Sequence, residues 1–346
     1  MKTSSNWLYK YILGFSIFFS LLNAALEVVV VFFRESFSYD LLVIAGWLNF
    51  KSFELQYMTG RIFDFTYFVE EGSYGYSGSF LDYAFALVFL VGTAFYWVSK
   101  GKSKRILIFC YSILFMMSVI TFVEIGQEFF EFFELSLLLF VALMKYSILM
   151  FISGSMVASW IKERLPKELT LNSENEHQET AVVTASKAQK VVRLSNLLLD
   201  TFFIVILFSY YVFRSRHEWV QTLSNILPDS ISGSVIFAIF ATFYYLIFEG
   251  IFRTTPAKIL TNSVVTLIDQ KKTEFVDVLI RTLCRRIPFD AISYFGRTGW
   301  HDALSETTVI KLEKEEKKYV LAYRIILVLI VIGLLACVYF ENRNRW

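Results

Sequence analysis

The sequence predicts an all-α polytopic membrane protein with about seven transmembrane helices and a basic amphipathic helix on the cytoplasmic side. Hydrophobic residues make up 56% of the 346 residues and charged residues only 18%, which is more apolar than a soluble core of this size requires. Apolar runs of about 18 or more residues recur, and each is long enough to cross a hydrocarbon core of about 30 Å. The runs show no strict alternation of apolar and polar residues, which favours helices over a β-barrel.

The first half, residues 1–162, is expected to form a four-helix membrane domain. Its first apolar run is too long for the core of a cleaved signal peptide, so we expect it to be a retained span. An external loop, residues 34–79, follows that run. The four predicted spans are residues 8–33, 80–98, 106–125 and 135–161.

The distribution of charge predicts the orientation of these spans. The turn at residues 100–105 is basic, whereas residues 124–134 are rich in acidic side chains. Positive charge prefers the cytoplasmic side of a membrane. The N-terminus is therefore expected in the cytoplasm.

A polar linker, residues 163–190, separates this half from a second membrane domain, residues 191–346. The second domain has apolar runs at residues 194–213, 235–252 and 319–340. Residues 253–318 contain twelve Lys or Arg and no adequate span, so we expect this segment inside the cell and the C-terminus outside.

Four ionisable residues lie in the predicted spans of the first half: Glu27, Asp82, Glu124 and Lys145. If the helices form a bundle, the lysine can reach the carboxylates across its interior. Two interpretations stay open. The four residues form an ion or proton site, or they form a charge pair that fixes helix packing.

In the second half, the charges gather toward the cytoplasmic ends of the spans. Arg193 and Asp200 lie seven residues apart, so two helical turns place them on one face. An ionisable group costs about 2.5–3.5 kcal/mol inside an apolar span, so such a face normally meets a partner or a cavity. Proton coupling and a static salt bridge both agree with this pattern. The predicted charge network is Arg193, Asp200, Glu249, Lys258, Arg281, Arg285 and Asp302.

The basic amphipathic helix is predicted at residues 276–287, where Arg281, Arg285 and Arg286 lie beside an apolar face. That face is expected to contain Val278, Leu279, Leu283 and Ile287. A basic helix at the inner leaflet attracts anionic lipid headgroups. The arginines are therefore interpreted as solvated charges or as headgroup ligands, and Asp302 as a possible pairing partner of Arg281 or Arg285.

The sequence contains no catalytic signature, and we expect no enzyme activity. Its histidines, His177, His217 and His301, fall in segments where no two can easily share a metal. Three scattered cysteines form no metal set. We expect no metal, no cofactor and no nucleic-acid partner.

Three blocks in the second half resemble the RDD family of bacterial membrane proteins, over residues 185–312. They read RLSNLLLD from Arg193, YYLIFEGIFRTTPAKIL from Tyr244 and RTGWHDALSETTVI from Arg297. The arginine and two aspartates that name the family fall on Arg193, Asp200 and Asp302. Ala257 stands where the family usually has glycine. The first half resembles no family.

The resemblance implies a location in the bacterial inner membrane and transport of a small ligand. One hypothesis is therefore a transporter of an ion or small solute, with the charge network as its inner site. The alternative is a non-catalytic membrane scaffold that binds another protein. The lipid bilayer is the expected surrounding in both cases.

Overall fold

The structure is a computed structural model that describes residues 9–22, 25, 80–132, 137–164, 187–214, 222, 225–268, 273–286, 299–312 and 323. It divides into two compact units. Unit 1 is formed by residues 1–150 and 315–346, and unit 2 by residues 151–314. The predicted loop 34–79, most of the linker 163–190 and nearly all of the C-terminal run 319–340 lie outside the described residues. The predicted domain boundary stays a prediction.

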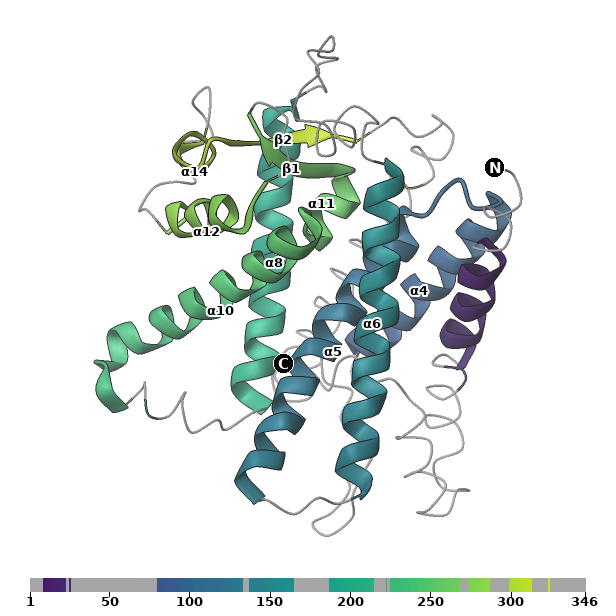
Figure 1. The fold of residues 1–346 in the computed structure, drawn as a ribbon, viewed down its shortest axis with the longest axis horizontal. Coiled ribbons are helices and arrows are strands. Elements are labelled where there is room, and N and C mark those ends of the chain that lie inside the picture. Colours follow the sequence, from purple (N-terminus) through teal and green to yellow (C-terminus); the bar gives the residue numbers. More distant parts are fainter. Residues whose placement is uncertain are drawn as a thin grey trace, which may run out of the picture. The chain divides into compact units, whose positions relative to one another are not determined.

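The described chain is largely helical, which confirms the predicted class (Figure 1). Among the described residues, three helices are long and apolar enough to cross a membrane: Arg105–Val123, Leu143–Arg164 and Ile231–Phe252. The expected total of about seven spans stays a prediction.

Aromatic packing joins the helices of unit 1. Helix Tyr9–Leu22 meets α4 (Phe80–Val98) and α5 (Arg105–Phe132). The Phe89 ring lies edge-on to Phe19 at 5.4 Å and to Tyr111 at 5.5 Å. Gly92 lets α4 approach α5, because a Cβ there would lie 3.1 Å from the backbone nitrogen of Leu107. The long helix α6 (Leu137–Arg164) follows α5 along the chain.

Unit 2 is organised around α8 (Lys190–Arg214), on which polar residues face inward. Arg193, Asn196 and Asp200 are buried at helical spacing, and Leu194 and Leu198 are exposed. This pattern reverses that of a soluble helix, in which apolar residues face the core. It suits a helix surrounded by lipid, in which charges are confined to the protein interior.

Helix α10 (Asp229–Phe252) packs against α8 and ends in a turn that starts the short helix α11 (Pro256–Thr261). Arg253 adopts a left-handed conformation with φ 54° and ends α10. The Thr255 side chain then accepts a hydrogen bond from the Lys258 backbone, and Pro256 occupies the first turn, where its missing N–H costs nothing. This turn places Lys258 beside the C-terminal end of α10.

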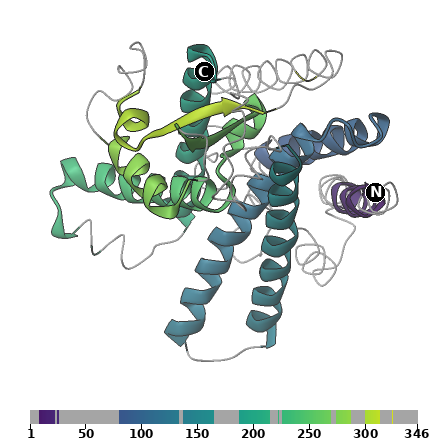
Figure 2. The same cartoon turned by 45° about the horizontal axis from the view of Figure 1, so that its top comes forward.

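A two-stranded antiparallel sheet, absent from the sequence prediction, follows α11. Strand β1 (Ser263–Leu267) pairs with β2 (Thr307–Lys311), with Val265 opposite Val309. Both strands are rich in Val and Thr, which suit strands. Figure 2 shows the pair beside α11, and a backbone bridge between Lys187 and Ile310 ties it to the segment before α8.

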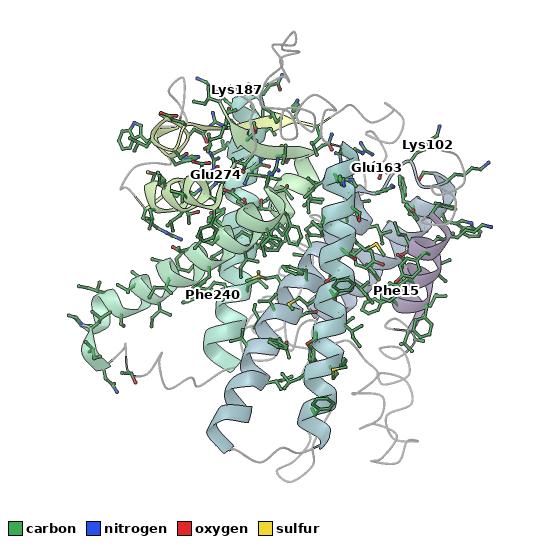
Figure 3. The ribbon with its side chains drawn as sticks, viewed as in Figure 1. Phe15, Lys102, Glu163, Lys187, Phe240 and Glu274 are labelled. Atoms are coloured by element: carbon green, nitrogen blue, oxygen red, sulfur yellow. The ribbon has the colours of Figure 1, made fainter. Side chains whose placement is uncertain are left out.

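The two strands are connected through α12 (Phe275–Cys284) and α14 (Trp300–Leu304). Helix α12 packs against both α10 and α14. Figure 3 labels Glu274, the N-cap residue of α12, and Phe240 on α10. Contacts of α14 with both α12 and β2 connect the sheet to these two short helices (Figure 1).

Candidate functional site

Unit 2 brings together all seven residues of the predicted charge network. They come from five helical elements, and every side chain is at most 9% exposed. The contributions are Arg193 and Asp200 from α8, Glu249 from α10, Lys258 from α11, Arg281 from α12 with Arg285 at its C-cap, and Asp302 from α14. We call these seven residues the charge network.

Lys258 lies between two carboxylates. Its Nζ is 2.8 Å from Glu249 Oε1 and 3.4 Å from Asp200 Oδ2. The ammonium also lies 3.4 Å from the hydroxyl of Thr255. One cation from the turn after α10 therefore links α10 to α8.

Both oxygens of Asp200 accept hydrogen bonds from hydroxyl groups. Tyr244 donates to Oδ1 at 2.8 Å and Thr255 donates to Oδ2 at 2.9 Å. Together with Lys258 on Oδ2, these donors hold the carboxylate in one orientation.

Glu249 is completely buried and meets two arginines as well as the lysine. Arg285 Nη2 donates to Oε1 at 2.8 Å, and Arg281 Nε lies 3.3 Å from Oε2. The Arg285 guanidinium also lies 3.9 Å from the ring centroid of Tyr245, a cation–π contact. Glu249 on α10 therefore pairs with cations from both α11 and α12.

Asp302 joins the remaining arginines. Arg193 pairs with Oδ2, and Arg281 donates to Oδ1 and to the hydroxyl of Thr307. The ring nitrogen Nε2 of His301, which is fully buried, lies 3.3 Å from Oδ1. The conformation of α14 and the start of β2 are therefore linked to α8 and α12 by charge pairs.

Helix α12 differs in part from the amphipathic surface helix that was predicted. Arg281 is 1% exposed and contacts Glu249 and Asp302, so it is not a solvated charge or a headgroup ligand. Val278 is buried beside it, whereas Leu283 is 54% exposed, so the predicted apolar face is divided between interior and surface. The structure contains the expected pair of Asp302 with Arg281, and Arg285 pairs with Glu249.

A cavity of about 10 Å³ lies within the network, with room for about one water molecule. Its lining residues are Arg193, Asn196, Leu197, Asp200, Tyr245, Lys258, Arg281, Arg285 and Val309. Four cations and one carboxylate therefore surround it. In the whole network, four cations face three carboxylates, a formal excess of one positive charge.

A fifth cation lies at the edge of this region. Lys187 precedes α8 and pairs through its backbone with β2. Partial burial and the nearby Arg193 guanidinium lower the pKa of the Lys187 ammonium.

Sequence reasoning missed several polar residues that hold the network. Tyr244 and Thr255 bind Asp200, and Asn196 lies on the same face of α8 as Arg193 and Asp200. The Asn196 amide donates to the Ser263 hydroxyl at 3.1 Å and so connects α8 to β1. The helical spacing of Asn196 from Asp200 was a usable signal. The contacts of Tyr244 and Thr255 required the tertiary structure.

The first-half charges fall largely outside the described residues. Glu27 is not described, and of Asp82 and Glu124 only the backbone is, in α4 and α5. Lys145 lies in α6, half-buried, with Nζ 5.2 Å from the Tyr146 ring centroid. A site formed by these four residues stays a prediction.

The pairing in the network predicts energetic coupling between Asp200 and Lys258. Asp200→Asn and Lys258→Gln should each lower the free energy of unfolding by about 3–5 kcal/mol, because each leaves a buried charge with fewer partners. The double variant should lose less than the sum, by about 0.5–3 kcal/mol. Unfolding of the purified protein in detergent measures these values.

The matched control pairs Asp200→Asn with Arg193→Gln. Arg193 pairs with Asp302 and Asp200 pairs with Lys258, so this second combination should be closer to additive. Strict additivity for Asp200 and Lys258, or equal coupling in both combinations, would contradict the assigned pairs.

The C-terminal part of the chain is similar to a known protein family. Residues 187–346 match the model of the RDD family, which is a family of membrane proteins. No curated protein and no solved structure matches the chain. The matched region contains the whole charge network. The chain is a membrane protein whose C-terminal part, residues 187–346, is similar to the RDD family.

Proposed function

We propose that this protein transports a small ion across the bacterial inner membrane, with the charge network as its binding site. The observation that carries the proposal is the charged cavity that reaches Asp200. Charged residues within membrane domains are rare and expensive, and they commonly mark ion pathways. A cavity about the size of one water molecule suits a small ion better than an organic solute.

Lys258 supplies the element that can change during transport. Its ammonium sits on a flexible four-carbon stem between Asp200 and Glu249, at 3.4 and 2.8 Å. An ion entering the cavity changes the local charge and so changes which carboxylate the lysine prefers. Because the two carboxylates belong to α8 and α10, this exchange would alter how the two helices are held together.

A scaffold function is the second candidate, and the dense pairing of the network favours it. Each of the three carboxylates has at least one cation within 3.4 Å, so the network can serve folding alone. In that case the charges fix the arrangement of the five helices, and the protein acts by binding a partner.

We also propose that the charge network lies on the cytoplasmic side, with the N-terminus inside and the C-terminus outside. The basic turn at residues 100–105 and the basic segment 253–318 support this orientation. On α12, Phe275, Ile280 and Leu283 are exposed and would lie against the inner leaflet.

Reporter fusions test the orientation. A reporter active only in the cytoplasm should work when inserted at Gly101 and fail when fused after Trp346. The reverse pattern would refute the proposed topology.

Flux through proteoliposomes tests transport. The purified full-length protein should dissipate at least one imposed gradient of H⁺, Na⁺, K⁺ or Cl⁻. Asp200→Asn should slow that flux at least tenfold, since it removes the carboxylate that lines the cavity and pairs with Lys258. The control is Glu163→Gln, the same chemical change at an exposed residue of α6, which should leave the flux unchanged.

An unchanged flux in Asp200→Asn would refute the transport site. Absence of any flux, together with a second protein that co-purifies in stoichiometric amount in mild detergent, would establish the scaffold function in its place.

A further inference from the structure

We propose that the cavity in the charge network binds a small inorganic anion of halide size. The inference rests on the proposed function, because it names the class of ion that the same site would carry. It follows from the charges around the cavity, from the state of its one carboxylate and from its size.

The walls of the cavity are strongly cationic. Arg193, Lys258, Arg281 and Arg285 all line it, and Asp200 is the carboxylate among the lining residues. Glu249 and Asp302, which pair with these cations, do not line the cavity. An ion at its centre therefore meets mainly positive charge, which attracts an anion and repels a cation.

Asp200 is poorly placed to act as a cation ligand. One oxygen accepts from Tyr244 at 2.8 Å, and the other accepts from Thr255 at 2.9 Å and faces Lys258 at 3.4 Å. A metal cation would have to displace these donors and approach the Lys258 ammonium. An anion needs none of these changes.

The volume of the cavity limits the ligand to a small ion. About 10 Å³ accommodates about one water molecule, so a chloride or bromide ion fits after modest relaxation. A phosphate group, with four oxygen atoms around its phosphorus, is too large. The size of the cavity therefore favours a halide over free phosphate or a phospholipid headgroup.

Chloride-35 NMR on the full-length protein in detergent tests the proposal. Chloride is added to a sample prepared in sodium gluconate, and the chloride line should broaden beyond a detergent blank. Bromide should reverse the broadening by competition for the same site. In parallel, the unfolding temperature should rise saturably with chloride and remain constant with gluconate at the same ionic strength.

Three variants locate the binding site. Arg285→Gln removes a lining cation and should weaken chloride binding at least tenfold. Asn196→Asp adds a carboxylate to the wall at nearly constant shape, and it should have a similar effect. Arg286→Gln removes the neighbouring exposed arginine, which does not line the cavity, and should bind chloride like the unchanged protein.

The unchanged protein alone can overturn the proposal. If it is folded and broadens the chloride line no more than the detergent blank, the cavity holds water only. Equal broadening by folded Arg285→Gln and folded Asn196→Asp would also refute this site. If one of these variants does not fold, the other variant and the competition by bromide still test whether chloride binds in this cavity.

The results separate this inference from the proposed transport. If the protein binds halide but carries no flux of any tested ion, the anion site is supported and the transport function is refuted. If the protein carries a cation flux but binds no halide, the anion site is refuted and the transport function is supported.

Discussion

Pairing of buried charges is the constraint on which unit 2 depends. Lys258 between Asp200 and Glu249 is its clearest instance, since one ammonium from α11 contacts carboxylates on two different helices. Removal of one partner from a buried pair costs about 3–5 kcal/mol, which is a large part of the stability of a domain. The relative positions of α8, α10 and α11 are therefore determined by charge as well as by apolar packing.

This constraint explains why the polar and apolar faces of unit 2 are reversed. Arg193 and Asp200 on α8 and Arg281 on α12 are buried, while apolar neighbours such as Leu198 and Ile280 are exposed. In water this arrangement would be unfavourable, because it exposes apolar surface and buries charge. In a bilayer it places apolar side chains against lipid and lets the charges meet one another. The similarity of residues 187–346 to the RDD family agrees with that surrounding.

The helical class and the members of the charge network could be predicted from the sequence. Both depend on local features, namely the length of an apolar run and the presence of a charged residue within it. The helical class followed from uncharged runs, and the seven network residues followed from the RDD-like blocks. The side-chain pairs within the network could not be predicted in the same way. Asp200 pairs with Lys258, which is 58 residues away, whereas the nearby Arg193 on its own helix pairs with Asp302. The strands β1 and β2 were missed because each has only 5 residues and their pairing spans a long segment. The sequence placed Arg281 in the network and named Asp302 as its partner, and the structure shows that pair. The burial of Arg281 was not expected, because a basic amphipathic helix is typical of a membrane surface.

Amine labelling in intact membranes tests the central claim most directly. Lys258 is 3% exposed and held by two carboxylates, whereas Lys190, at the start of α8, is exposed. With an amine-reactive reagent and mass spectrometry, Lys190 should be modified readily and Lys258 should remain protected until the protein unfolds. Modification of Lys258 at the rate of Lys190 in the folded protein would show that its ammonium is not buried between Asp200 and Glu249, and would contradict the account.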